Sequence, residues 1–302
     1  MENILSKIEE LKKRKNAVIL AHYYQPMEIQ LAADIVGDSL ELARKSRDTK
    51  ADILVFCGVT FMGESAKLLC PDKKVLLPAP NAGCAMADTV SERDVLDLKA
   101  AHPDSAVVCY INSTAATKAL CDICCTSANA VRVVKGLKED SVIFVPDKNL
   151  GDYVAEQAPE KRFFIHEGCC YVHDSLSLAA VAEAKARYPR AAVLVHPECK
   201  SEVRKAADFI GSTTQIINYC ESSPLDEFII CTETGVTERL RYLLPDKRFY
   251  VPEGKALFCR AMKLITLEGL LKTLEEESGE VLIDPALREK ALLPITRMLE
   301  LG

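Results

Sequence analysis

The chain has 302 residues, of which 49% are apolar and 27% charged, and its formal net charge is −6 with a pI of about 5.6. This composition is typical of a globular protein, and without a basic stretch it argues against binding to nucleic acid or to an anionic membrane. No apolar run is long enough to cross a bilayer, and the first residues are charged rather than like a signal peptide. We therefore expect a cytoplasmic protein.

The first part of the chain alternates helices and apolar strands. A charged amphipathic helix over residues 1–15 precedes an apolar strand over 17–22, and the next helix begins at residues 37–39, with Asp38 or Ser39 as its cap. A strand over 52–57, a helix over 63–69 and a strand over 75–77 follow. Continuous apolar strands that alternate with helices predict a parallel sheet covered on both faces.

The rest of the chain repeats this pattern twice. The middle part is predicted to form helices at 91–101, from Ser127 and at 151–157, with strands at 106–112, 141–147 and 163–165. The last part is predicted to form helices at 175–186, 201–209, from Ser212 and at 236–244, with strands at 192–198, 227–231 and up to Val251. We expect an α/β fold of three similar parallel-sheet units around a pseudo-threefold axis with a central active site. The predicted units are residues 1–88, 89–174 and 175–263, with the tail helices of 264–302 packed on the first.

Thirteen cysteines are unusual in a chain expected to lie in a reducing compartment, where they favour metal or cluster ligation over disulfides. Cys84, Cys170 and Cys259 each follow the last strand of a unit and a glycine, and their residue numbers rise in two nearly equal steps. Three thiolates can bind a [4Fe–4S] cluster and leave one iron open as a Lewis acid. Zinc on these thiolates, with His173 as the fourth ligand, is the alternative.

Most of the other cysteines are predicted to lie in the core. Cys57, Cys109, Cys220 and Cys231 occur within or beside apolar strand or helix patterns. The densest cluster, residues 121–125, contains three cysteines between two predicted helices and has no equivalent in the other units. We favour a core role for Cys121, Cys124 and Cys125 over a redox or ligand pair.

Polar residues collect where strands end and helices begin. One predicted helix start in each unit carries a hydroxyl, at Ser39, Ser127 and Thr213. Three such starts around one cavity could bind carboxylates and a phosphate, with ordinary capping as the alternative. A second set suits proton transfer, with the histidines placed at strand ends: His22, Tyr24, Tyr110, Asn112, His173, His196 and Glu198. As the one carboxylate in this set, Glu198 is the candidate general base.

Taken in order, these motifs resemble the quinolinate synthase family, and they span nearly the whole chain. They are His22-Tyr-Tyr24, Gly37-Asp-Ser39, Asn81-Ala-Gly-Cys84, Tyr110-Ile-Asn112, Thr126-Ser127, Cys170-x-x-His173, His196-Pro-Glu198, Gly211-Ser-Thr213 and Cys259. The resemblance implies three α/β units around a pseudo-threefold axis. It also implies a [4Fe–4S] cluster held by Cys84, Cys170 and Cys259.

The resemblance further implies an activity. Members of the family condense iminoaspartate with dihydroxyacetone phosphate to quinolinate, phosphate and water in NAD biosynthesis, a transferase reaction that forms a carbon–carbon bond. Carried over to this chain, the catalytic residues would be Glu198, Tyr24, His22, His173 and His196. The substrate-binding residues would be His22, Ser39, Tyr110, Asn112, Ser127, His196, Glu198 and Thr213. The enzyme that supplies iminoaspartate is a candidate partner.

One departure from the family concerns the third cysteine. Some members carry Cys-x-x-Cys-x-x-Cys there, proposed as a redox switch, but the two other positions are Glu253 and Ala256 here. This argues against that disulfide and leaves catalysis untouched. Two other functions remain open: a cluster-dependent hydro-lyase acting on a small hydroxy acid, and a non-catalytic iron–sulfur sensor.

Overall fold

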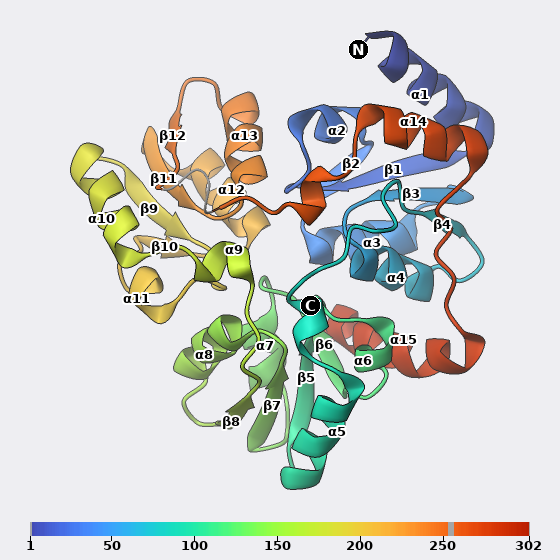
Figure 1. Cartoon of the computed structure of the whole chain (residues 1–302). Helices are drawn as coiled ribbons and strands as arrows, with labels where there is room; N and C mark the ends of the chain where they lie inside the picture. Colours follow the sequence, from blue (N-terminus) through green and yellow to red (C-terminus); the bar gives the residue numbers. More distant parts are fainter. Residues whose placement is uncertain (1, 253–256, 302) are drawn as a thin grey trace.

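A computed structural model describes residues 2–252 and 257–301 of the chain. The described residues form three four-stranded sheets, with strand orders β2-β1-β3-β4, β6-β5-β7-β8 and β10-β9-β11-β12. The pairings between the strands are parallel, which confirms the predicted α/β fold of three similar units. Figure 1 shows the sheets as three lobes around a common centre.

The first sheet and its helices come from the N-terminal part of the chain. Its central strands β1 and β3 are mostly apolar and largely buried, as expected for a covered parallel sheet. Asp38 caps α3 by accepting hydrogen bonds from the N–H groups of Leu40 and Glu41. The elements are α1 (Glu2–Lys15), β1 (Ala17–His22), α2 (Met27–Ala32), β2 (Ile35–Gly37), α3 (Ser39–Asp48), β3 (Ile53–Cys57), α4 (Thr60–Leu69) and β4 (Lys74–Leu76).

The second and third sheets repeat this order. The second comprises η1 (Ala87–Thr89), α5 (Glu92–Ala101), β5 (Ala106–Tyr110), α6 (Ala115–Lys118), β6 (Ile123–Cys125), α7 (Ala130–Lys135), β7 (Ser141–Val145), α8 (Lys148–Gln157), β8 (Arg162–Ile165) and α9 (Tyr171–Asp174). The third comprises α10 (Leu178–Arg187), β9 (Ala192–Val195), α11 (Ser201–Arg204), β10 (Phe209–Ile210), α12 (Thr213–Ser222), β11 (Glu227–Cys231), α13 (Thr234–Leu243) and β12 (Arg248–Tyr250). The tail forms η2 (Ala261–Lys263), α14 (Leu267–Glu276) and α15 (Pro285–Leu301).

The same aspartate contact recurs in all three sheets. The carboxylates of Asp34, Asp122 and Asp208 accept hydrogen bonds from the backbone N–H fifteen positions earlier, at 2.8, 2.7 and 2.8 Å. In each unit the aspartate precedes a short strand and ties it to the unit's first strand. This repeat supports a common plan for the three sheets.

Several predicted elements differ from the observed ones. The helix expected from Ser127 begins at Ala130, with Asn129 at its N-cap and Ser127 in the preceding turn. The helix expected over 201–209 ends at Arg204, because Phe209–Ile210 forms strand β10. Residues 123–125, expected between two helices, form strand β6. The missed strands β2, β6 and β10 have only two or three residues each, which is too short for a hydrophobic period to mark them without other signals.

The hydrophobic core is divided unevenly among the sheets. One continuous cluster joins the first and second sheets to the tail, whereas the third sheet has a separate cluster on each face. Helix α14 packs against α1, while α15 contacts α6 and β6 of the second sheet as well as α4 of the first. The tail, which we expected on the first unit, therefore contacts elements of both the first and the second sheets. No helix among the described residues is long and apolar enough to span a membrane.

Candidate active site

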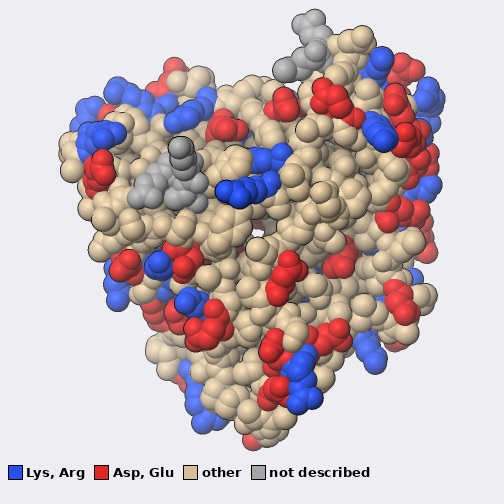
Figure 2. Space-filling model, in the orientation of Figure 1, with Lys and Arg blue, Asp and Glu red and all other residues tan. Residues whose placement is uncertain are grey.

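The three sheets direct the carboxyl ends of their strands toward one central cavity of about 230 Å³. Parallel strands place the residues that follow them at one sheet edge, so all three units contribute side chains. Twelve of the thirteen predicted site residues line this cavity: His22, Tyr24, Ser39, Cys84, Tyr110, Asn112, Ser127, Cys170, His196, Glu198, Thr213 and Cys259. On the face shown in Figure 2, acidic and basic side chains are mixed, and a narrow opening lies near the middle.

His173, the thirteenth predicted residue, lies just behind the cavity wall. It is part of the short helix α9 rather than of a strand end, and it is fully buried. Its Nδ1 lies 2.7 Å from Glu198 Oε2, and its Nε2 lies 2.9 Å from Thr232 Oγ1. The ring stacks on His196 with the centroids 4.5 Å apart. His173 therefore links Glu198 to the end of β11.

Glu198 is the electrostatic centre of the site. Its Oε1 accepts a hydrogen bond from the Tyr110 hydroxyl, and Oε2 pairs with His173. Burial by itself would raise the pKa of this carboxyl, but the attraction of His173 and the hydrogen bonds from His173 and Tyr110 lower it well below its usual value. Glu198 is therefore ionised at neutral pH and already bound through both oxygens.

Tyr24 extends this network toward the first sheet. Its hydroxyl lies 3.2 Å from Thr232 Oγ1 and accepts a hydrogen bond from Thr213 Oγ1 at 3.3 Å. Burial and the nearby Glu198 charge raise the pKa values of Tyr24 and Tyr110 well above their usual value, so both phenols are neutral donors. Thr232 was not among the predicted site residues, although it follows an apolar strand as they do.

Two neutral histidines face the same space. Burial lowers the pKa of His22 to about 4 and that of His196 to about 3. The backbone N–H of Tyr24 donates to His22 Nδ1 at 3.1 Å, and that of Glu198 donates to His196 Nδ1 at 3.3 Å. Because Nδ1 accepts in both rings, the proton resides on Nε2, which makes each imidazole a donor to a ligand oxygen.

The polar helix starts differ in detail. Ser39 and Thr213 are the first residues of α3 and α12, which Asp38 and Ser212 cap. Ser212 also donates to Asp38 at 3.3 Å, so the two helix starts adjoin each other across the first and third sheets.

Asn112 Oδ1 is buried and has no partner among the described residues. A buried acceptor of this kind indicates a place for a donor group of a ligand.

The three cysteines reach the cavity from three different loops. Burial raises the pKa of Cys84 to about 12 and also raises the pKa values of Cys170 and Cys259. The Cys170 N–H donates to Asp147 at 3.0 Å, and the Cys259 N–H donates to Glu233 at 3.1 Å. Partly buried thiols that line one cavity could hold a metal or cluster, which would replace their protons.

The zinc alternative fits this arrangement less well. Ligand atoms of Cys170, His173 and Glu198 lie within 4.8 Å of one another and form a compact group. However, His173 Nδ1 already lies 2.7 Å from Glu198 Oε2, His173 Nε2 lies 2.9 Å from Thr232 Oγ1, and Glu198 Oε1 accepts from Tyr110. A zinc ion there would have to break the network that orients Glu198. Cys84, Cys170 and Cys259 line the same cavity and could hold a metal or cluster instead.

The remaining conspicuous histidines and cysteines have structural surroundings. His166 Nδ1 accepts from the Gly168 N–H at 3.0 Å, and His102 stacks on Phe164. The cysteines predicted to lie in the core, and those of the dense cluster, are buried in the sheets and helices away from the cavity: Cys57, Cys109, Cys121, Cys124, Cys125, Cys220 and Cys231. The positions of the family's extra cysteines, Glu253 and Ala256, lie outside the described residues.

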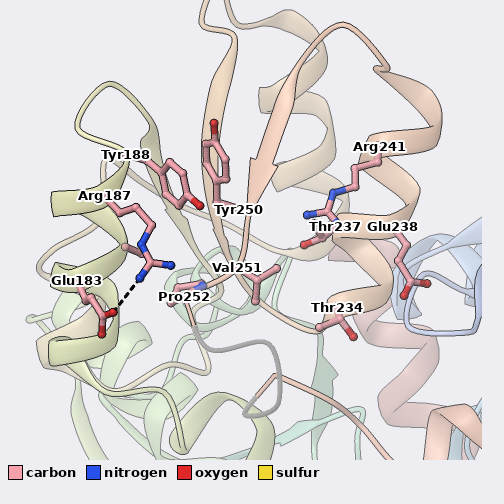
Figure 3. A pocket seen from close by; sticks show the side chains of 11 residues that line it. Glu183, Arg187, Tyr188, Thr234, Thr237, Glu238, Arg241, Tyr250, Val251 and Pro252 are labelled. Carbon is pink, nitrogen blue, oxygen red and sulfur yellow. Dashed lines mark hydrogen bonds and ion pairs between the residues drawn. The ribbon is translucent and has the colours of Figure 1, made fainter.

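A larger hollow of about 390 Å³ lies on the third unit, between α10 and α13 (Figure 3). Arg187 there is paired with Glu183, and the Arg241 guanidinium donates to the Phe249 carbonyl. Among the described residues that line the hollow, none is a cysteine or a histidine. The central cavity is therefore the better candidate for chemistry.

Comparison with known proteins agrees with this geometry. The model of the family described as quinolinate synthetase A protein matches residues 6–300. A quinolinate synthase of Clostridioides difficile is 49% identical over 301 residues, covering 100% of this chain and 99% of the relative. One of Alkaliphilus metalliredigens is 49% identical over 99% of this chain and 98% of its own. One of Aquifex aeolicus is 46% identical over 100% and 95%, respectively.

Proposed function

Because the chain belongs to the quinolinate synthase family, we propose that its central cavity condenses iminoaspartate with dihydroxyacetone phosphate and releases quinolinate, phosphate and water. The observation that carries the proposal is the single cavity shared by three cysteines, a proton-transfer network and polar helix starts. Iminoaspartate brings two carboxylates and its partner a phosphate. The reaction needs donors for these anions and a path for protons.

We infer that Cys84, Cys170 and Cys259 would hold a [4Fe–4S] cluster. They come from three units, line one cavity and are partly buried, which suits a cluster that faces a substrate on one side. When bound, such a cluster supplies an iron with an open position that acts as a Lewis acid.

The protein residues divide into those that bind the substrates and those that move protons. The Nε2–H groups of His22 and His196 donate to substrate oxygens, while Ser39, Ser127 and Thr213 hold the carboxylates and the phosphate. Asn112 Oδ1 accepts from the imine or amine nitrogen. These donors lie around one cavity, so the two substrates are brought together with their reacting carbons adjacent.

Glu198 accepts the proton that leaves the substrate carbon, either directly or through Tyr110 or His173, which already bind it. Tyr24 returns a proton to the leaving oxygen, and its link through Thr232 to His173 connects it to the same carboxylate. One chain of hydrogen bonds thus connects the group that accepts the proton to the group that returns one.

The test compares two adjacent cysteines. After anaerobic reconstitution, wild type is expected to hold about four iron atoms and four sulfides per chain, and Cys170→Ala to lose them. Cys169→Ala is the matched control and is expected to retain them. Quinolinate formation should require both substrates. Turnover of a hydroxy acid without dihydroxyacetone phosphate would favour the hydro-lyase, and a cluster without turnover would favour the sensor. Zinc in place of iron would contradict the proposed cofactor.

A further inference from the structure

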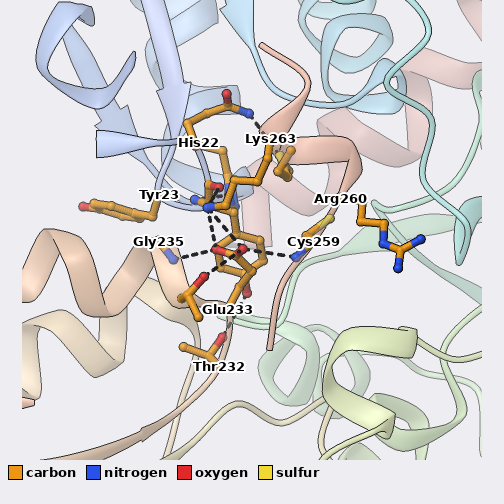
Figure 4. Close-up of polar contacts among 12 residues, drawn as sticks. His22, Tyr23, Thr232, Glu233, Gly235, Cys259, Arg260 and Lys263 are labelled. Atoms are coloured by element: carbon orange, nitrogen blue, oxygen red, sulfur yellow. Dashed lines mark hydrogen bonds and ion pairs between the residues drawn. The ribbon is translucent and has the colours of Figure 1, made fainter. Parts of the chain in front are cut away.

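We propose that Glu233 is a positioning residue that fixes Cys259 and Tyr24 relative to each other, a role that rests on the proposed function of the cavity. Figure 4 shows the carboxylate of Glu233 at the point where segments of the first unit, the third unit and the tail meet. Neither Glu233 nor Lys263 is among the described residues that line the cavity. Any effect on the reaction must therefore pass through the residues they hold.

Glu233 follows β11 and is fully buried. Its Oε1 accepts a hydrogen bond from the N–H of Cys259 at 3.1 Å, and its Oε2 accepts one from the N–H of Gly235 at 2.7 Å, at the start of α13. One carboxylate therefore caps a helix and anchors the backbone of a proposed iron ligand. Hydrogen bonds to a carboxylate that is paired with an ammonium, as here with Lys263, are stronger than those between neutral groups.

Lys263 connects Glu233 to the first unit. Its side chain is 13% exposed and lies 3.2 Å from the Glu233 carboxylate. The same ammonium donates to the carbonyl of Tyr24 at 2.6 Å. The proposed ligand Cys259 and the proton donor Tyr24 are therefore connected through one buried ion pair.

Close backbone contact makes this connection rigid. A Cβ atom at Gly235 would lie 2.5 Å from the carbonyl oxygen of Tyr23 and 3.0 Å from the Cα of Tyr24. The start of α13 can therefore lie directly against the end of β1. The Gln30 amide donates to the Tyr23 carbonyl at 2.8 Å on the same side. The junction has little room to shift while the ion pair holds.

The second unit contains an equivalent carboxylate. Asp147 follows β7, is fully buried, caps α8 through the Leu150 N–H and accepts a hydrogen bond from the Cys170 N–H. Asp147 and Glu233 occupy equivalent positions at the ends of equivalent strands. The recurrence of a capping carboxylate beneath two of the three cysteines argues that it serves the cysteines, because capping alone needs no such contact.

The experiment compares Glu233→Gln with Glu227→Gln. Glu227 is the first residue of β11 and forms ion pairs with Arg190 and Arg248. It therefore resembles Glu233 in its place at an end of β11 and in its ion pairing, but it does not contact the described residues of the cavity. Backbone hydrogen exchange is measured first in the metal-free protein. In Glu233→Gln, exchange over residues 257–263 and 22–25 is expected to rise at least about tenfold, and in Glu227→Gln these segments should match wild type.

A second measurement follows the reconstituted proteins. Loss of iron to a chelator is expected to be about tenfold faster in Glu233→Gln, with kcat reduced more than KM is raised. Unchanged exchange in both segments would overturn the proposal whatever the metal content. If wild type holds no iron but the exchange rises as expected, the positioning role stands and the proposed cofactor fails.

Lys263→Met separates the contact with Tyr24 from the contact with Cys259. It removes the bond to Tyr24 and keeps the bond between Glu233 and the Cys259 N–H, so exchange should rise over residues 22–25 more than over 257–263. If Glu233→Gln does not accumulate as folded protein, the exchange measured in Lys263→Met alone tests the proposal. Equal exchange changes in both segments would then refute the role of Lys263 as the link to Tyr24.

Discussion

Replacing Glu198 with glutamine removes the charge at the centre of the network and keeps its shape. The amide oxygen can still accept from Tyr110, but the amide NH2 faces His173 Nδ1, which now lies 2.7 Å from a carboxylate oxygen. The contact between residue 198 and His173 must therefore rearrange. The variant therefore tests the proton network with little change in packing.

The size of the effect follows from burial. The side chains of Glu198 and His173 are 4% and 1% exposed, so solvent does not screen their interaction. Breaking a buried ion pair costs about 3–5 kcal/mol when the partner stays charged. Because glutamine keeps the shape of the side chain, the expected loss is that of a charge-assisted hydrogen bond, about 1.5–3 kcal/mol of unfolding free energy. Loss of the base should reduce kcat by about 10²–10⁴-fold.

Three measurements on the same preparation give a clear answer. Iron and sulfide content should equal that of wild type, denaturant unfolding should show the modest loss of stability, and quinolinate formation should fall by the stated factor. If Glu198→Gln turned over at the wild-type rate with its iron intact, the assignment of Glu198 as base would be wrong. A loss of iron in step with activity would instead make Glu198 a structural support of the cysteines.

Two further predictions concern stability. His22 and His196 have folded-state pKa values of about 4 and about 3, below the unfolded value of about 6.5; the unfolded chain therefore binds more protons, and stability should fall as the pH drops from about 6.5 toward 3. Thermal melts across this range should show a smaller pH dependence in His196→Gln, and an unchanged dependence would contradict the buried, neutral state of His196. Gly235→Ala should cost about 1–3 kcal/mol of unfolding free energy, because the new Cβ meets backbone rather than a flexible side chain. Gly269→Ala, whose nearest neighbour would lie 3.4 Å away, is the control for denaturant unfolding, and equal stability of the two variants would refute the close approach at Gly235.

The sequence was most informative where local pattern decides the structure. Long apolar strands such as 53–57 and 141–145 and the residues that follow them were predictable, because an apolar run followed by a break marks the edge of a parallel sheet. The short strands β2, β6 and β10 were not predicted, although β4 and β12, which are equally short, were. The aspartates that precede the missed strands, Asp34, Asp122 and Asp208, are the signal that could have revealed them.

The supporting residues of the site were harder to find for a different reason. Thr232 and Glu233 follow a strand like the predicted residues, but their roles depend on partners distant in the sequence, His173 for one and Cys259 for the other. His173 was predicted as part of the site but not as part of a helix. Contacts of this kind come from the assembly of the three sheets, which no local pattern encodes.

The divided hydrophobic core has a consequence for how the chain unfolds. The first two sheets and the tail share one continuous apolar cluster, whereas the third sheet is stabilised by clusters of its own. We therefore expect two units of cooperativity, with the cavity at their boundary. Opening of the third sheet alone would withdraw Glu198 from the cavity and leave Cys84 in an intact core. A ligand that bridges the two units would then protect the third sheet more than the others, and would turn two melting transitions into one.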